Sequence, residues 1–259
     1  MLACMLLVFL GFVALGTWQV KRLFWKLDLI ARVDQRVHAP AVAAPAVQDW
    51  PDVNADGQEY LHVRVNGVYL YQYTVKVQAA TDLGAGYWLL TPLRAEDGAL
   101  YLINRGYVTA EGALADRQRH QGTVATSASA LSVSGLLRIS EPGGGFLRHN
   151  DAAADRWFSR DVQAIAARHQ LNKLAPYFID AAADPADAIR ESQMLSAGEP
   201  IAGLTVIAFR NSHLVYAFTW YALALMTAGA CFWAVRDEKR QRQAQADSHA
   251  QDNEDGKQG

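Results

Sequence analysis

The sequence has few cysteines and none in its central part. Cys4 and Cys231 are the only two among 259 residues, and both stand in long apolar runs. The central region therefore contains no disulfide, and the cysteines do not indicate a redox compartment. The C-x-x-C-H sequence is also absent, which excludes the standard covalent attachment of c-type haem.

Motifs of the common enzyme classes are missing as well. The chain has no P-loop, no G-x-S-x-G nucleophile elbow and no H-E-x-x-H zinc site. Its formal net charge of −2 and the lack of a basic stripe give no support for nucleic-acid binding. These absences predict a protein that is not an enzyme and binds no nucleic acid.

Charged side chains are missing from two long stretches, residues 1–20 and 211–235. Each approaches or exceeds the ~20 apolar residues that cross a hydrocarbon core of ~30 Å. Because a bilayer offers no water to backbone groups, each stretch is predicted to be a transmembrane helix. The first could instead be a cleaved secretory signal, since residues 14–16 resemble a signal-peptidase site. Its length and the lack of a preceding basic residue favour a retained helix, and that lack also fits a true start further upstream.

Basic residues follow both predicted helices, so charge alone leaves the orientation open. Lys21, Arg22 and Lys26 follow the first helix, and a second basic cluster follows the second helix. Because basic clusters tend to lie on the cytoplasmic side, the two clusters favour opposite orientations of the chain. Residues 236–259 lack apolar periodicity and predict a disordered tail. The basic cluster of this tail consists of Arg236, Lys239, Arg240 and Arg242.

The region between the apolar runs divides into three parts. Residues 21–38 have apolar side chains at helical spacing and predict a juxtamembrane helix. Residues 39–58 are rich in Pro and Ala and predict an extended linker. Residues 59–200 carry short β-like runs and predict an α+β, mainly antiparallel β, domain on one side of the membrane. The β-like runs are 61–65, 69–77, 87–93, 100–103, 131–139 and 177–179.

Connections within this domain can also be predicted. Residues 66–67 (NG) and 96–98 (EDG) are typical of hairpin turns. Residues 109–130 are rich in small and polar side chains and predict a surface excursion. Ser159 is expected to cap a helix with Asp161 in its first turn. The apolar face of that helix would be formed by Val162, Ile165 and Ala166.

One candidate site lies at the start of the second apolar run. An ionisable side chain such as His213 at a membrane boundary needs a partner or a function. On a helix, Ala217 and Trp220 share its face and Tyr216 lies beside it. The small Ala217 would leave room beside the imidazole, which could ligate a haem iron while the two aromatic rings pack on the porphyrin. Alternatively, these aromatic and imidazole groups anchor the helix among the lipid headgroups.

The first helix carries a matching pattern. Trp18, Arg22 and Trp25 fall on one face, and Arg22 could meet a haem propionate or a lipid phosphate. The alternative for Arg22 is interfacial snorkelling, in which the aliphatic stem lies in the apolar layer and the charge reaches water.

Several blocks of sequence resemble the surfeit locus protein 1 family. They occur in the family's order and include both apolar runs, with Tyr107 and Thr109 as departures where the family usually has Trp and Pro. The blocks are 15–22 (LGTWQVKR), 86–93 (GYWLLTPL), 103–108 (INRGYV), 157–161 (WFSRD), 176–179 (PYFI), 211–214 (NSHL) and 216–220 (YAFTW).

This resemblance implies a cytochrome c oxidase assembly factor of the bacterial inner membrane. It implies that the chain binds haem a through His213 and assists its insertion into oxidase subunit I, with haem a synthase as a possible further partner. It also implies a periplasmic central domain and a cytoplasmic C-terminal basic cluster. Two other readings stay open: a membrane scaffold that binds no haem, and a membrane enzyme or sensor with an extracytoplasmic ligand domain.

Overall fold

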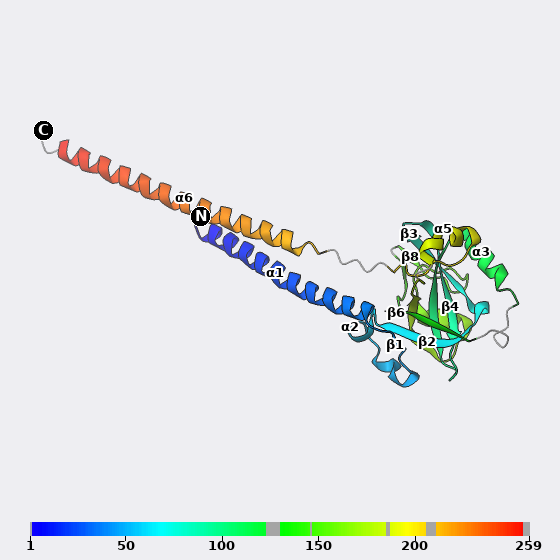
Figure 1. Cartoon of the computed structure of the whole chain (residues 1–259). Helices are drawn as coiled ribbons and strands as arrows, with labels where there is room; N and C mark the ends of the chain where they lie inside the picture. The colour runs from blue at the N-terminus through cyan, green and yellow to red at the C-terminus, as the bar shows by residue number, and fades with distance from the viewer. Residues whose placement is uncertain (1, 123–129, 146, 185–186, 206–210, 256–259) are drawn as a thin grey trace. The chain divides into compact units, whose positions relative to one another are not determined.

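The structure is a computed structural model that describes residues 2–122, 130–145, 147–184, 187–205 and 211–255. The chain folds as two compact units. One joins Met1–Ala31 to Ala208–Gly259, and the other is Arg32–Ile207. Figure 1 shows long helices in the first unit and a sheet-rich domain in the second. Two long apolar helices with a sheet-rich domain between them in the sequence are the arrangement predicted above.

The first unit is built from helices α1 (Leu2–His38) and α6 (His213–Asp255). The last turns of α1 belong to the second unit. By length and composition, both helices contain a stretch able to cross a membrane. Most of their large apolar side chains are exposed in the structure, which is unusual for a protein surrounded by water.

Helix α6 continues far beyond the apolar run, to Asp255, although the sequence predicts disorder from residue 236. The tail is rich in Gln, Ala and Arg, which are strong helix formers. A side-chain pair one turn apart adds support, because Arg242 donates to Glu238 at 2.5 Å. The absence of an apolar stripe therefore does not prevent helix formation here.

The second unit contains a seven-stranded sheet in the order β1-β2-β6-β9-β5-β4-β3. Strands β1–β2 and β5–β9 pair in parallel, and the other pairs are antiparallel. The strands are β1 (Val42–Ala43), β2 (His62–Tyr69), β3 (Val75–Thr81), β4 (Gly84–Arg94), β5 (Leu100–Val108), β6 (Leu131–Ile139) and β9 (Leu174–Ala181); a separate hairpin joins β7 (Gly144–Gly145) to β8 (Arg148–His149).

Five of these strands close into a ring. Strand β2 also pairs with β4, through Val68↔Arg94 and Tyr69↔Leu93, so β2, β6, β9, β5 and β4 form a small barrel. Its interior is filled by alternate residues of each strand, as the two-residue period of a strand requires. The buried interior cluster includes Val63, Val65, Tyr101, Ile103, Val133, Leu137, Tyr177 and Ile179.

The predicted hairpin turn at residues 66–67 is wrong, because both residues lie inside β2. Gly67 stands where β4 returns to close the barrel, and a Cβ there would lie 2.3 Å from the carbonyl oxygen of Arg94. A glycine in a strand often marks such a close backbone approach. The turn predicted at residues 96–98 is confirmed, since Gly98 has φ 80° and its N–H donates to Ala95 between β4 and β5.

Residues 39–58 are more ordered than the extended linker that the sequence suggests. They contain β1, the 3-10 helix η1 (Val47–Asp52) and the short helix α2 (Ala55–Gln58). Trp50 packs against the barrel interior, and its indole N–H donates to the carbonyl of Pro45 at 3.0 Å. The Tyr177 hydroxyl donates to the same carbonyl, so this segment belongs to the domain.

Helix α3 (Ala110–Arg119) forms part of the surface excursion expected at residues 109–130, of which 123–129 lie outside the described residues. Thr109 caps it by accepting a hydrogen bond from Gly112 N–H. The buried Asp116 of α3 receives two hydrogen bonds, of 3.1 and 2.6 Å, from Arg105 on β5. This bidentate pair holds α3 on the barrel, which composition alone did not indicate.

The predicted helix after Ser159 is helix α4 (Val162–His169), with a different cap. Asp161 is the N-cap, and its carboxylate accepts from Ala164 N–H at 3.0 Å. The Ser159 hydroxyl donates instead to the carbonyl of Glu141. Val162 and Ile165 are buried, as the apolar spacing predicts.

A buried carboxylate on β9 organises the polar contacts near α4. Asp180 is 3% exposed and receives hydrogen bonds from Asn104, Arg138 and Arg160. Arg160 also donates twice to Glu141, at 3.0 and 2.5 Å. Burial raises the pKa of Glu141, but these hydrogen bonds and the guanidinium charges outweigh it and leave that pKa lowered. The contact between Glu141 and Arg160 is therefore favoured by the ionised form of Glu141.

Candidate functional site

The first unit carries the residues that the sequence singled out, and its two helices meet along one face of each. On α1, Phe12, Gly16 and Gln19 have the spacing i, i+4, i+7 and therefore share a face. Gln19 contacts His213 on α6, and the ring of Phe12 stacks on Trp220 at 5.7 Å between centroids. From the first contact to the second, the residue number decreases on α1 and increases on α6. The two helices therefore run antiparallel where they pair.

Small residues allow the two helices to approach closely. A Cβ on Gly16 would lie 2.8 Å from a carbon of the Tyr221 ring, so only glycine fits there without a shift. The hydroxyl of Tyr221 lies 3.2 Å from Thr17 Oγ1, within hydrogen-bond distance. Ala217 and Ala224 are each 3% exposed on the face that meets α1. This packing of small residues is typical of helix pairs in membranes.

The decisive polar contact joins the imidazole of His213 to the amide of Gln19. His213 Nδ1 and Gln19 Oε1 are 2.7 Å apart, and both side chains are partly buried. An amide oxygen only accepts hydrogen bonds, so in this contact Nδ1 carries the proton. In the neutral form of the ring, the lone pair is then on Nε2, the ring nitrogen that does not contact the Gln19 amide.

Such an arrangement matches the chemistry of a histidine ligand. A metal-binding histidine commonly donates its other ring N–H to a carbonyl or carboxylate, which fixes the tautomer and the ring orientation. Among the described residues, no group of three or more His, Cys, Asp or Glu side chains is arranged to hold a bare metal ion. An iron porphyrin needs only an axial ligand from the protein, so a single oriented histidine fits it.

The two aromatic residues predicted beside His213 have different environments. Tyr216 is 53% exposed, so its ring is accessible from outside the helix pair. Trp220 is partly buried and packs on Phe12. The room that Ala217 was expected to leave beside the imidazole is filled, because Ala217 is buried in the helix pair.

The predicted residues of the first helix lie on another face of α1. Trp18 precedes Gln19 by one residue and is therefore rotated from it by about 100° around the helix; it is 55% exposed. The guanidinium of Arg22 lies 3.9 Å from the centroid of the Trp25 ring, as a cation–π pair. None of the contacts formed by the described part of the chain joins Trp18 or Arg22 to His213.

Gln19 was not among the predicted site residues, although a signal existed. It is the one side-chain amide in residues 1–20. An amide in an apolar helix has no water to bond and so tends to find a partner on a neighbouring helix. The sequence therefore contained a signal that Gln19 pairs with a polar side chain of the other apolar run, such as His213 at its start.

A separate apolar cavity of about 420 Å³ lies further along the helix pair. Its nearest lining residue on α6 is at least roughly 22 Å from His213 at 1.5 Å per residue. The cavity is therefore not part of the His213 site. It is lined by Ala3, Leu6, Phe9, Ala228 and Cys231.

Comparison with known proteins identifies the family. The SURF1 family model matches residues 6–225, a span that includes both Gln19 and His213. The chain belongs to the SURF1 family. Surfeit locus protein 1 of Rattus norvegicus is 32% identical to it over 230 residues, which cover 83% of this chain and 69% of the rat protein.

Other SURF1 relatives come from distant organisms. Surfeit locus protein 1 of Homo sapiens is 31% identical over 231 residues, covering 83% of this chain and 70% of the human protein. The SURF1-like protein of Rickettsia bellii (strain RML369-C) is 27% identical over 222 residues, covering 85% and 84%. The family predicted from the sequence blocks is thereby confirmed, and it includes a bacterial relative.

Proposed function

We propose that this SURF1-family chain is an assembly factor for cytochrome c oxidase that binds haem a and assists its insertion into oxidase subunit I. It acts as a chaperone and not as an enzyme. The observation that carries the proposal is the hydrogen bond between His213 and Gln19, which orients the imidazole at the start of an apolar helix and leaves Nε2 free of that contact.

Each residue near this imidazole has a role in the proposal. His213 ligates the iron through Nε2, while Gln19 holds the ring through Nδ1. Tyr216, exposed on the next turn, offers a ring to the porphyrin. When bound, haem a would supply an iron that takes an imidazole ligand and a strongly apolar farnesylated porphyrin. A site along apolar helices keeps that surface out of water.

Trp220, Trp18 and Arg22 take secondary roles. Trp220 supports the site indirectly, because its stacking on Phe12 fixes the two helices beside His213. Trp18 and the Arg22–Trp25 pair form an exposed aromatic and cationic surface that suits a propionate or a lipid headgroup. Both ligands are anionic, and the haem propionate is the one that the proposed function requires.

The proposed location is the inner membrane, with both helices crossing the bilayer and residues 37–199 in the periplasm. The basic cluster at residues 236–242 would then be cytoplasmic, as the positive-inside rule favours. Oxidase subunit I, and haem a synthase as the source of the cofactor, are the proposed partners. A cysteine at the exposed Glu96 should react with a membrane-impermeant maleimide from the periplasmic side, in a chain without Cys4 and Cys231. Labelling only after the cytoplasmic side is opened would contradict this topology.

A scaffold that binds no haem is the second candidate, and one observation favours it. The face of α6 around Ala217 and Ala224 is filled by packing and not open to a ligand. On that account, His213 and Gln19 simply satisfy each other between two helices. A scaffold would hold oxidase intermediates and carry no pigment.

The two candidates can be separated by purifying the full chain from cells that make haem a. The chaperone account predicts haem a in stoichiometric amount, with an absorption spectrum typical of histidine ligation. It also predicts that cells without the gene make oxidase subunit I with less haem a. A colourless protein that still co-purifies with oxidase intermediates would favour the scaffold.

A further inference from the structure

Strand β3 is an outer edge of the sheet, and part of this edge is open. The N–H of Gln78 donates to the carbonyl of Trp157 at 2.8 Å, so the backbone groups of Gln78 point away from β4. Because this direction alternates along a strand, the N–H and C=O of Ala80 point the same way. In the part of the chain that the structure describes, no backbone group pairs with Ala80 on that side.

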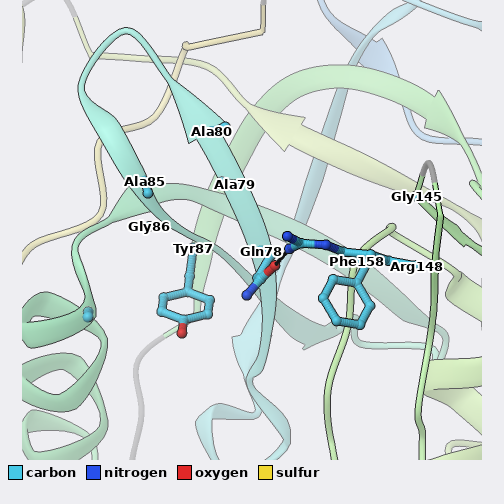
Figure 2. Close-up of a pocket in the computed structure, with 10 residues that line it drawn as sticks. Gln78, Ala79, Ala80, Ala85, Gly86, Tyr87, Gly145, Arg148 and Phe158 are labelled. Carbon is cyan, nitrogen blue, oxygen red and sulfur yellow. Dashed lines mark hydrogen bonds between the residues drawn. The ribbon is translucent and has the colours of Figure 1, made fainter.

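A groove of about 570 Å³ runs beside this open edge. Figure 2 shows Ala79 and Ala80 on one strand, Ala85 and Gly86 on the next, and Arg148 with Phe158 opposite them. The floor of the groove has no side chain longer than a methyl group on these two strands, at Ala79, Ala80, Ala85 and Gly86. An extended chain could therefore approach the backbone of β3 at Ala79 and Ala80 without meeting a long side chain at those two positions.

The groove has a cation without an anionic partner. Arg148 donates to the neutral amide oxygen of Gln78 at 2.6 Å, and its guanidinium lies 5.5 Å from the centroid of the Phe158 ring. None of the ion pairs among the described residues includes Arg148. A guanidinium has five N–H donors and binds carboxylates with two of them at once, so most of its capacity is unused here.

An exposed leucine stands next to this arginine. Leu147 is 86% exposed and belongs to the turn that joins β7 to β8. Its φ of 57° is in the left-handed region, where a branched residue is uncommon and glycine or asparagine is usual. A large apolar side chain in an uncommon backbone conformation, fully presented to solvent, suggests a contact with another molecule.

We propose that this groove binds an extended segment of a partner protein that carries an acidic side chain. The segment pairs with the free backbone groups of β3 around Ala80, as in strand addition. Its carboxylate meets Arg148, and an apolar neighbour contacts Leu147 and Phe158. A second copy of the chain does not suit the groove through β3 itself, because Val75–Thr81 (VKVQAAT) contains no carboxylate.

The test selects ligands without assuming the partner. A phage library of random ten-residue peptides is panned on the full chain in lipid nanodiscs, and synthetic copies of the enriched peptides are titrated by fluorescence anisotropy. We expect enriched peptides to contain Asp or Glu within a β-prone run and to bind Arg148→Gln at least tenfold more weakly. The matched control Arg64→Gln, on the exposed face of β2, should bind like the parent.

Two variants at Ala80 test the backbone contact. Ala80→Pro removes the outward N–H, and Ala80→Trp keeps that N–H but fills the groove; both should reduce binding at least tenfold while the thermal midpoint shows that the domain is folded. No enrichment, peptides without acidic residues, or equal affinity for Arg148→Gln would each overturn the proposal. A concentration-dependent dimer that Arg148→Gln dissociates would also overturn it, since the groove would then be a self-interface.

Discussion

Replacing Gln19 by leucine should weaken haem binding much more than it weakens the helix pair. Leucine has nearly the volume of glutamine but accepts no hydrogen bond, so the imidazole of His213 loses its only described polar partner on α1. The ring can then rotate and exchange tautomers, and Nε2 is no longer held as the free nitrogen. The proposed ligand remains, but its orientation is lost.

The expected magnitudes separate the two effects. Loss of an outer-shell partner of a metal ligand typically costs 10–100-fold in affinity, which is about 1.4–2.7 kcal/mol. A hydrogen bond between membrane helices contributes about 0.6–2 kcal/mol to their association. The helices also keep the Phe12–Trp220 stack and the close contact of Gly16 with Tyr221. We therefore expect a folded, inserted variant that binds haem a 10–100-fold more weakly.

The assay is a haem a titration of the purified chain in nanodiscs, followed by absorption spectroscopy. Thr17→Val is the matched control, because it removes a second polar contact between the helices, that of Thr17 with Tyr221, and leaves the imidazole untouched. Gln19→Glu should retain haem and lower its midpoint potential, since a carboxylate acceptor makes the ring more basic. If Gln19→Leu binds haem with the parent's affinity and spectrum while His213→Ala does not, the amide has no orienting role.

Three further variants test the packing and the charge network. Gly16→Val should separate the helices at Tyr221 and destabilise their pairing by about 1–3 kcal/mol, whereas Gly11→Ala, which meets nothing within 4 Å, should not; equal helix-association energies would contradict the packing. Asp180→Ala removes the buried carboxylate that accepts from the partly buried Arg138 and Arg160, which keep Glu141 as a partner, and should lower the free energy of unfolding by about 1–3 kcal/mol in urea titrations; a change below about 1 kcal/mol would contradict the network. Because the pKa of Glu141 is lowered on folding, its stabilisation is present above its ordinary pKa of 4.5 and is lost as the pH falls through the folded value; thermal midpoints of Glu141→Gln should therefore depend less on pH in the acidic range than those of the parent.

Local patterns in the sequence predicted much of the secondary structure. Alternating apolar residues gave the barrel strands, because each of them has one face on the barrel interior. The single run expected at residues 69–77 is wrong, since the 3-10 helix η2 (Tyr71–Tyr73) separates the end of β2 from β3. Helix α4 followed from apolar residues at helical spacing, with its cap displaced from Ser159 to Asp161 because that carboxylate reaches the free N–H of Ala164. The two apolar helices followed from the absence of charge alone.

Features that depend on contacts between distant segments were not predictable in the same way. Asn66-Gly67 has the composition of a turn, but the glycine is required by the approach of β4, which is distant in sequence. Closure of the barrel depends on two residue pairs between β2 and β4 that no periodicity reveals. Helix α3 is held by the pair of Arg105 with Asp116, so its position came from tertiary structure and not from an apolar stripe.

In the candidate site, too, local sequence predicted one part and contacts between distant segments determined the rest. His213 could be selected because an ionisable group at a membrane boundary is unusual. The face that seemed open beside it is filled, because small residues serve helix packing as readily as they leave room for a ligand. Gln19 was missed because the prediction followed the aromatic pattern of Trp18 and Trp25, which lies on another face of α1 than the adjacent Gln19.

The central claim is that His213 ligates haem a, and His213→Ala tests it most directly. The full chain and this variant are purified from cells that make haem a, with His38→Ala, an exposed histidine of the second unit, as the control. The account predicts that His213→Ala loses or shifts the haem absorption bands and lowers oxidase maturation, while membrane insertion and the control spectrum stay as in the parent. Spectra and haem stoichiometry identical to those of the parent would contradict the account and make His213 an interface anchor in a scaffold.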